Sequence, residues 1–391
     1  MDLLLTHGYF ISEDEKEQAI MKPYAPLGML YLSSYLRRKG FDVEIYDTTF
    51  GSRRELLDIL GSGPPAVLGI YSTLMTRPSV LKIIAAARSL GWIVVLGGPE
   101  PSAYAEEYLD AGAHLIVEGE AEVTLEEVLA TLRNSDGGLL HRIPGLVFRN
   151  VCGSIIRTPA RNLTGDLDSL PWPDRERIDL EKYVRAWRDR HGQSSLSLVT
   201  ARGCPFNCHW CSHSVFGSTH RRRSVKGVAD EVEWLLKRYE PDRLWIADDV
   251  FTIQRSWILQ YAREMGERRL QVPFECITRA DRIDSQVSDA LAELGCFRVW
   301  IGCESGSQRI LDAMNRGVTL EQVRNAIRHC RESGIETGMF VMWGYEDEDL
   351  ADVEATIEHV KTARPDYFLT ALSYPIKGTQ YYRDVENRLI S

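Results

Sequence analysis

The sequence predicts two α/β units in tandem, a doubly wound parallel sheet followed by a partial (βα)6 barrel. Three observations predict this fold class. The chain has 391 residues, which is more than one ordinary hydrophobic core accommodates. Short apolar segments alternate with helical patterns along both halves of the chain. In the second half these strand–helix units recur at intervals of about 30–45 residues, as they do in parallel barrels.

Five apolar strands are expected in the first unit, which we place at residues 1–140. Gly40 and Gly91 directly follow two of its helical segments and are expected to end them. Continuous apolar strands with helices between them imply a parallel sheet with right-handed crossovers. The strands are expected at 3–8, 41–47, 66–72, 93–98 and 114–120, and the helices at 27–39, 53–60, 79–90, 101–110 and 123–133.

The carboxyl ends of these strands are small, glycine-rich and polar. They read THG, YDTTFG, YST, GGPEPSA and EGEAE. Ligands of parallel sheets bind at this edge, and glycine lets the backbone approach a large polar ligand closely. The alternative is that each glycine only ends its strand. No nucleotide-binding fingerprint is present, because the sequence has neither a G-x-G-x-x-G segment nor a Walker lysine.

A hairpin and a linker are expected to join the two units, at residues 141–194. The hairpin covers 145–160 and turns at Cys152 and Gly153. The linker begins at 163 and contains Pro171 and Pro173, which exclude regular structure there. We expect this linker to be ordered and to be pinned by Leu170 and Trp172.

Six strand–helix repeats are expected in the second unit, which includes a C-terminal helix and covers 195–391. Each strand ends in polar or glycine residues, so the chemistry is expected at the carboxyl ends. Six strands are too few to close the usual eight-stranded barrel, and an open barrel leaves a lateral mouth for a large substrate. The strands are expected at 195–203, 243–249, 274–281, 298–305, 338–344 and 366–375, and the helices at 227–239, 254–268, 284–294, 319–332, 349–362 and 378–389.

Composition and charge argue against several classes of protein, namely those that bind nucleic acid, those that bind or span membranes, and secreted proteins. The formal net charge of −10 argues against general binding of nucleic acid or acidic membranes, and the basic run at 220–223 is too short to change this. No apolar run approaches the roughly 20 residues that span a bilayer. The N-terminus predicts a strand and not a signal peptide. Five of the eight cysteines are scattered singly, unlike those of a secreted disulfide scaffold, so we expect a cytoplasmic protein.

The segment GCPFNCHWC places Cys204, Cys208 and Cys211 within eight residues, directly after the first barrel strand. A structural zinc site needs four ligands, so His209 or His213 would have to supply the fourth. A redox pair of the thioredoxin type would leave Cys204 unexplained. An iron–sulfur cluster matches better, because three thiolates leave one iron open for another ligand.

This segment resembles the signature of the radical S-adenosylmethionine (SAM) superfamily, C-x-x-x-C-x-aromatic-C, with Trp210 as the aromatic residue. The resemblance implies a [4Fe–4S] cluster on the three cysteines, SAM chelated by the remaining iron, and reductive cleavage of SAM to a 5′-deoxyadenosyl radical. It also implies a small-molecule substrate and an external electron donor of the flavodoxin or ferredoxin type. Further segments that resemble the family are WIADDVF (245–251), IGCESGSQRILDAMNRG (301–317), FVMWGYEDED (340–349) and YPIKGTQYY (374–382).

The resemblance assigns SAM-binding roles to residues at the strand ends. Glu304 would bind the amino group of SAM with Ser305 nearby, unless it only caps a helix. Arg279 would pair with the SAM carboxylate, unless it forms an ion pair with Asp281. Asp248 would reach the ribose or a substrate hydroxyl, unless it caps the next segment.

Two further residues are assigned to the cluster and to adenine. Trp210 is expected to pack beside the cluster and exclude water. The backbone at Gly344 is expected to lie against the adenine. No catalytic residue is assigned from the sequence.

The first unit resembles the cobalamin-binding domain of one large radical SAM subclass, through the segments PLGMLYLSSYLR, GGPEPSA and EGEAE. Its cobalt-ligating histidine motif, D-x-H-x-x-G, is missing from the loop at 47–51. Many members of the subclass also lack it and hold cobalamin with no protein ligand to cobalt; the alternative is a domain that has kept the fold and lost the cofactor. The expected cobalamin-binding residues are Ser72, Gly97, Gly98, Glu118 and Gly119.

These expectations lead to a first hypothesis, a cobalamin-dependent radical SAM methyltransferase that acts on a carbon of a biosynthetic metabolite. The alternative is a radical SAM lyase or oxidoreductase that dehydrates, deoxygenates, cyclises or rearranges its substrate and has a cobalamin-free first domain. A third hypothesis, from another class, is a non-catalytic iron–sulfur sensor.

Overall fold

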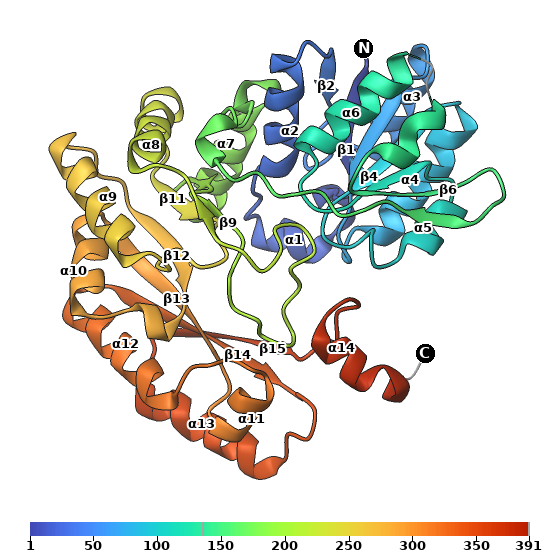
Figure 1. The fold of residues 1–391 in the computed structure, drawn as a ribbon. Helices are drawn as coiled ribbons and strands as arrows, with labels where there is room; N and C mark the ends of the chain where they lie inside the picture. Colours follow the sequence, from blue (N-terminus) through green and yellow to red (C-terminus); the bar gives the residue numbers. More distant parts are fainter. Residues whose placement is uncertain (135–136, 390–391) are drawn as a thin grey trace. The chain divides into compact units, whose positions relative to one another are not determined.

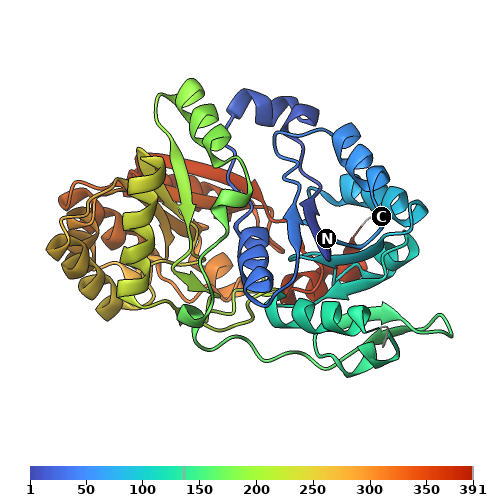
Figure 2. The ribbon, with the colours of Figure 1, turned by 90° about the horizontal axis from the view of Figure 1, so that it is seen from above.

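The computed structural model describes residues 1–134 and 137–389 and divides into two compact units (Figures 1 and 2). Met1–Gly192 and the short segment Ser214–Gly217 form the first unit. Gln193–His213 and Ser218–Ser391 form the second. Each unit has its own sheet, so each is described by itself.

The first unit contains a seven-stranded sheet of order β2-β1-β3-β4-β5-β6-β7. The first five strands of this order are parallel, and β6 and β7 extend the sheet as an antiparallel hairpin. The strand order reverses between β1 and β3, the switch point beside which ligands of such sheets bind. The strands are β1 (Leu3–His7), β2 (Val43–Ile45), β3 (Val67–Tyr71), β4 (Ile93–Gly97), β5 (Leu115–Val117), β6 (Leu146–Arg149) and β7 (Ile155–Arg157).

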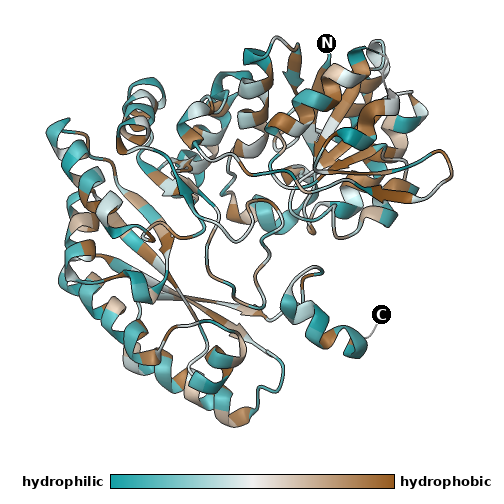
Figure 3. Ribbon diagram, viewed as in Figure 1, coloured by the Kyte–Doolittle hydropathy of each residue, from teal (hydrophilic) through white to brown (hydrophobic). Residues whose placement is uncertain are grey.

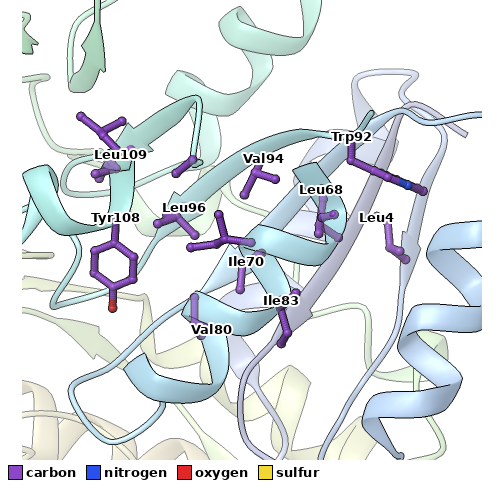
Figure 4. Packing of buried hydrophobic residues seen from close by; sticks show 14 of the residues in the cluster. Leu4, Leu68, Ile70, Val80, Ile83, Trp92, Val94, Leu96, Tyr108 and Leu109 are labelled. Carbon is purple, nitrogen blue, oxygen red and sulfur yellow. The ribbon is translucent and has the colours of Figure 1, made fainter. Parts of the chain in front are cut away.

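Helices cover both faces of this sheet, because apolar side chains alternate along its strands. The core on one face contains Leu4 and residues of α3, α4 and α5, and Figure 4 shows part of it, with Ile83 of α4 and Tyr108 of α5. The core on the other face contains Leu3, Leu5 and residues of α2 and α6. This is the doubly wound arrangement that the sequence predicts. The helices are α2 (Leu27–Arg38), α3 (Arg53–Ser62), α4 (Arg77–Ser89), α5 (Ala105–Asp110) and α6 (Glu122–Arg133).

Two helices of the first unit were not predicted, α1 (Glu15–Ile20) and α7 (Leu180–His191). The side chain of Asp179 caps α7 by accepting from the amide of Lys182 at 3.3 Å, and Gly192 ends the helix with φ of 72°. The buried Trp187 attaches α7 to the unit by donating from Nε1 to the carbonyl of Pro23 at 2.7 Å.

The linker before α7 is ordered, but its anchors differ from those predicted. Trp172 is 37% exposed and Leu170 is only partly buried. Leu167, Pro173 and Arg175 are the buried residues of this segment.

The second unit contains a six-stranded parallel sheet of order β15-β14-β13-β12-β11-β8. All six predicted strands are present, and the sheet is open at β8 and β15, so the partial barrel is confirmed. The strands are β8 (Ser195–Leu198), β11 (Arg243–Ile246), β12 (Phe274–Thr278), β13 (Cys296–Glu304), β14 (Glu336–Trp343) and β15 (Tyr367–Leu372).

The helices of the second unit are amphipathic, with polar residues on their outer surfaces (Figure 3). The short helix α11 was not predicted, and the last predicted helix is shorter than expected. The helices are α8 (Val225–Tyr239), α9 (Arg255–Glu267), α10 (Ser285–Glu293), α11 (Gln308–Ala313), α12 (Leu320–Glu332), α13 (Leu350–Ala363) and α14 (Gln380–Val385). Among the described residues, no helix has both the length and the apolar character needed to cross a membrane.

Candidate functional site

The three-cysteine loop leaves the carboxyl end of β8 and is closed at its base by two short antiparallel strands. These are β9 (Ala201–Arg202) and β10 (Arg221–Arg222). Asp248 lies beneath this base and is 3% exposed. Its carboxylate accepts from the amides of Thr200 and Ala201 at 2.6 and 3.0 Å.

Asp248 also lies 3.3 Å from the guanidinium of Arg222. These contacts engage both of its oxygens. The structure therefore places Asp248 in the support of the cysteine loop, through contacts with Thr200, Ala201 and Arg222 and not through a cap of the next segment. Its contact with ribose stays a prediction.

The middle of the loop is fixed through its backbone. The amide of His209 donates to the carbonyl of Met314 at 2.9 Å, and the carbonyl of His209 accepts from the amide of Tyr381 at the same distance. Asn315 donates from its side chain to the carbonyl of Asn207 at 2.8 Å. Because these bonds use main-chain groups, the cysteine side chains stay available for a ligand.

Two arginines contact the central cysteine. Guanidinium NH1 of Arg279 lies 3.8 Å from Sγ of Cys208, and NH1 of Arg316 lies 3.7 Å from the same atom. The Arg279 guanidinium also lies 3.6 Å from the ring centre of Phe206 in the same loop. Both arginines are buried, so the sulfur of Cys208 lies beside two guanidinium groups away from water.

The surroundings of Cys204 and Cys211 disfavour the charged thiolate form. Burial raises the pKa of Cys204, and burial together with the neighbouring Cys208 raises the pKa of Cys211 to about 12. Thiolates at these two positions need additional positive charge, which bound iron supplies. The predicted ligand set therefore fits a metal centre.

The number of cysteine ligands bears on the kind of metal centre. A closed zinc site takes four protein ligands, whereas each of three cysteines can bind a separate iron of a [4Fe–4S] cluster and leave one iron without a protein ligand. The three cysteines of the loop suit the second arrangement.

Glu304 ends β13 in a strained and buried position. Its φ is 69°, which is uncommon for a residue other than glycine, and the register between β13 and β14 shifts between Gly302 and Glu304. Burial raises the pKa of Glu304 to about 7, although Arg316 and Arg279 lower it. Nε of Arg316 lies 3.6 Å away, too far for a hydrogen bond, so the carboxylate can accept from a cationic ligand.

Gly302 makes room for this pair. A Cβ atom at Gly302 would lie 2.6 Å both from NH2 of Arg316 and from Oε1 of Glu304. The absence of a side chain at this position therefore lets the acid and the arginine share the carboxyl end of β13.

Ser305 and Arg279 both have partners within the protein. The hydroxyl of Ser305 accepts from the amide of Ser307 at 3.1 Å and lies 3.2 Å from that of Thr356. Nε of Arg279 donates to Asp281 at 2.9 Å, which is the ion pair that the sequence left open as an alternative. Contacts of these two residues with SAM remain predictions.

Trp210 lies in an apolar cluster next to the cysteines. Its partners are Ile310, Met314, Met342, Tyr345, Tyr381 and Val385. Tyr345 and Tyr381 stack with their ring centres 4.4 Å apart. Nε1 of Trp210 is buried and has no hydrogen-bond partner among the described residues. These contacts are consistent with the predicted exclusion of water.

Gly344 lies just beyond β14 in a conformation that suits a backbone contact. Its φ is 75°, its amide donates to Glu348 at 2.5 Å, and a Cβ atom there would meet no heavy atom within 4 Å. The open space beside it leaves room for the predicted adenine.

In the first unit, Ser72 and Gly98 hold neighbouring strand ends together. Ser72 is fully buried, and its hydroxyl lies 2.8 Å from that of Tyr108. A Cβ atom at Gly98 would lie 2.3 Å from the carbonyl oxygen of Ser72, and φ of Gly98 is 114°. Both residues shape the edge where a ligand is expected.

Glu118 and Gly119 follow β5 and have contacts within the first unit. Glu118 forms an ion pair with Arg157 and accepts from Ser102. Gly119 has φ of 75°, and its Cβ position lies 3.6 Å from the carbonyl oxygen of Val215.

Gly97 and the loop after β3 fit a large ligand with an apolar face. A Cβ atom at Gly97 would meet nothing within 4 Å. Tyr71 and Met75 nearby are 40% and 87% exposed. Open backbone beside exposed apolar side chains at the carboxyl edge of the sheet is compatible with cobalamin.

A histidine absent from the predictions, His7, lies at the end of β1. Its Nε2 is 2.9 Å from Asp47, and its Nδ1 is 2.9 Å from the hydroxyl of Thr48. Tyr183 donates to the same aspartate at 2.6 Å. Both ring nitrogens are therefore engaged, so His7 does not replace the missing cobalt ligand. Cobalamin would be held here without a histidine from this network.

Sequence reasoning also missed Arg316. The residue lies in the segment 301–317 that was matched as a whole, but its role depends on a contact with Cys208, 108 residues earlier in the chain. The arginine–glycine pair at the end of that segment was the available signal.

Comparison with known proteins agrees with this division into two units. The sequence pattern of the Radical SAM superfamily matches residues 198–360. The pattern of the B12 binding domain matches residues 20–129.

Related proteins cover most of the chain. An uncharacterized methyltransferase of Pyrococcus horikoshii, PH0819, is 30% identical over 372 residues, which are 91% of this chain and 77% of that protein. The anaerobic magnesium-protoporphyrin IX monomethyl ester cyclase of Rubrivivax gelatinosus is 27% identical and covers 94% and 67%. The cytidylyl-2-hydroxyethylphosphonate methyltransferase of Streptomyces wedmorensis is 24% identical and covers 92% and 77%.

Solved structures share the fold of both units. The radical SAM methyltransferase TsrM of Kitasatospora setae, with cobalamin and a [4Fe–4S] cluster bound, superposes with a TM-score of 0.78 at 22% identity and covers 95% of this chain and 72% of its own. The cobalamin-dependent SAM radical enzyme OxsB gives a TM-score of 0.79 at 20% identity and covers 99% and 55%.

Proposed function

Because the chain belongs to the radical SAM superfamily, in the subclass with a B12-binding domain, we propose that it transfers a methyl group to a carbon atom of a metabolite. One observation carries this proposal: a three-cysteine loop at the carboxyl end of a partial barrel and a B12-binding unit occur in the same chain. Its cofactors are a [4Fe–4S] cluster, SAM and cobalamin. When bound, they supply a 5′-deoxyadenosyl radical and a transferable methyl group.

The findings favour methylation over the non-methylating chemistry that the sequence left open. PH0819, which is 30% identical to this chain, is an uncharacterized methyltransferase. The match to the B12-binding family also covers the unit that the alternative took to be free of cofactor.

The residues of the second unit have distinct proposed tasks. Cys204, Cys208 and Cys211 hold the cluster, and Arg279 and Arg316 neutralise thiolate charge at the central cysteine. Glu304 binds the ammonium group of SAM, because it is a buried carboxylate with only a distant arginine partner.

Three further residues complete the proposed SAM site. The apolar cluster around Trp210 excludes water from the reacting groups. The backbone at Gly344 contacts the adenine. Ser305 positions the strand end through its bond with Ser307.

The first unit is proposed to hold cobalamin at the carboxyl edge of its sheet. Gly97 supplies open backbone, and Ser72 and Gly98 keep the strand ends together. Glu118 and Gly119 follow the next strand and border the same edge.

An external reductant and a reducing compartment complete the proposal. Cleavage of SAM needs one electron, which we assign to a flavodoxin or ferredoxin. All eight cysteines are free thiols in the structure, which suits the cytoplasm.

The test is turnover without oxygen, with SAM labelled in its methyl group, a chemical reductant and a fractionated metabolite extract. We expect 5′-deoxyadenosine together with a small molecule that has gained the labelled methyl group. A product that lacks the label and forms together with 5′-deoxyadenosine would contradict methylation and would indicate cyclisation or rearrangement.

A further inference from the structure

The sheet of the second unit has one face that helices do not bury. On β13, Val299, Ile301 and Cys303 point to one side and are at most 1% exposed. Arg298 and Trp300 alternate with them, point to the opposite side and remain partly exposed. The opposite side is therefore the inner face of the partial barrel.

Trp300 is held flat on this inner face. A Cβ atom at Gly338 on β14 would lie 2.2 Å from Cε3 of the indole, so the ring lies directly over the glycine backbone. Nε1 of Trp300 donates to Glu275 of β12 at 2.9 Å. The ring of Phe340 stacks beside it, with centres 5.4 Å apart and planes inclined by 21°.

Residues of three strands, β12, β13 and β14, hold the indole in this position. Glu275 is 9% exposed, and its carboxylate is also 3.5 Å from the guanidinium of Arg298. A buried carboxylate is costly unless it is paired, so its presence beside the indole is a built feature and not an incidental surface contact.

The indole lies next to the cluster site on the same face. Gly302 is two residues after Trp300 on β13, about 7 Å further along the strand. The Cβ direction of Gly302 points at Arg316 and Glu304, and Arg316 contacts Cys208. A molecule resting on Trp300 therefore lies next to the groups proposed to hold SAM and the cluster.

The apolar surface continues onto β15. Tyr367 and Leu369 pair in register with Gly338 and Phe340, so they share the inner face. They are 44% and 53% exposed. The guanidinium of Arg298 lies 4.2 Å from the ring centre of Tyr367 and binds Glu336 at 2.6 Å, which makes the amino end of this face polar.

We propose that these four side chains, Trp300, Phe340, Tyr367 and Leu369, form an aromatic platform that binds the substrate and selects a planar, unsaturated ring system. The proposal rests on the proposed function, which places the cluster and SAM at the carboxyl ends of these strands, next to Gly302. A locked indole offers a flat π face at little entropic cost, and aromatic stacking adds affinity beyond burial of apolar area. A saturated ring of the same size gains binding free energy only from the burial of its apolar surface, because it cannot stack on the indole.

The test compares two carboxylates with the same carbon skeleton, planar 2-naphthoate and saturated decahydro-2-naphthoate. Their dissociation constants are measured by calorimetry without oxygen, on the holoenzyme and on the variant Trp300→Leu. We expect the wild type to prefer 2-naphthoate and the variant to lose about 2- to 10-fold of that preference. Trp234→Leu is the matched control, because Trp234 lies on α8 and not on the inner face, and it should keep the preference.

Phe340→Leu serves as a second variant, should replacement of Trp300 prevent folding, and it should lower the same ratio. An unchanged ratio in both variants, or no binding of 2-naphthoate to the wild type, would overturn the platform. If the face were a contact between two copies of the chain, Trp300→Leu would shift a dimer to a monomer without changing the ratio, which would also overturn it.

The result of this binding experiment can be distinguished from the result of the turnover experiment that tests the proposed function. Formation of 5′-deoxyadenosine and transfer of label to product report on the reaction, whereas the ratio of dissociation constants reports on the platform alone. If Trp300→Leu lowers the preference for 2-naphthoate, the platform is supported even when the protein transfers no methyl group. If the enzyme forms labelled product but its preference for 2-naphthoate does not depend on Trp300, the platform is refuted and the proposed function stands.

Discussion

At the scale of single residues, Glu304 combines burial, a strained backbone and a shifted pKa at one strand end. A carboxyl buried in this way is unfavourable for stability, and such positions are common at functional sites. This fits the proposed role of Glu304 in binding the ammonium group of SAM. Arg279 and Arg316, which both contact the sulfur of Cys208, are likewise buried.

Replacing Glu304 with Gln should change stability in a pH-dependent way. The pKa rises from 4.5 to about 7 on folding, so the folded protein holds a proton that the unfolded chain releases, and stability falls as pH rises through this window. Glu304→Gln should therefore exceed the wild type in the free energy of unfolding by about 3 kcal/mol above pH 7 and by little near pH 4.5.

Denaturant unfolding of cofactor-free protein at several pH values measures this difference. Glu293→Gln, an exposed change on α10, is the control and should show no such dependence. A constant difference across the pH range would contradict the shifted pKa. In loaded protein the Glu304 variant should bind SAM more weakly, because the ammonium group loses its anion.

Changing any one of the three loop cysteines to Ala should remove the cluster. Two thiolates leave two irons without protein ligands, so reconstituted protein should contain little iron and lack the cluster absorbance. Cys152→Ala is the matched control, since Cys152 is an exposed free thiol outside the loop. Full iron content in a loop variant would refute the assignment.

At the scale of elements, the close contact between the end of β13 and helix α13 depends on Gly306. A Cβ atom there would lie 2.4 Å from Cα of Thr356 and 2.7 Å from the carbonyl oxygen of Ala355. Both are backbone atoms of α13, so neither can move without shifting the helix.

Gly306→Ala should therefore lower the free energy of unfolding by about 1–3 kcal/mol through overpacking. Gly266→Ala on α9 is the opposite case, because its Cβ would meet nothing within 4 Å, and the change should raise stability by up to about 1 kcal/mol. Denaturant unfolding of both variants measures the two effects. Equal effects from the two substitutions would show that the contact with α13 is not tight.

Helix α7 was not predicted, although its sequence carries the pattern of an amphipathic helix. Its buried residues Leu180, Tyr183, Val184 and Trp187 have the helical spacing, and Asp179 and Gly192 are typical caps. Pro171 and Pro173 exclude regular structure only before this helix, and the amphipathic pattern begins after them. The strands, in contrast, were predicted correctly because each is a short apolar run between helices.

At the scale of the whole molecule, two sheets with separate cores are expected to load their cofactors separately. Gly97→Leu places a side chain into open space at the edge of the first sheet, so it should be tolerated by the fold and should block the corrinoid. We expect this variant to lose corrinoid and keep its iron, and Cys208→Ala to lose iron and keep corrinoid. Elemental analysis for cobalt and iron measures both. Loss of cobalt and iron together in either variant would contradict independent loading.

Sequence patterns alone predicted the two-unit architecture, the three-cysteine loop and the order of the main strands and helices, although α1, α7 and α11 were missed. These features depend on local periodicity and on residues close together in the chain, and local physical chemistry decides them. The resemblance to a known superfamily rested on the same short segments.

Which side chains meet depends on the folded arrangement of the chain. Arg279 and Arg316 reach Cys208 across 71 and 108 residues, and His7 meets Asp47 across 40. Asp248 likewise turned inward to support the loop. These contacts depend on strand order and register, because a shift of one residue turns a side chain to the opposite face of its sheet. For that reason, the electrostatics of the site and the flat indole on the inner face became apparent only in the folded chain.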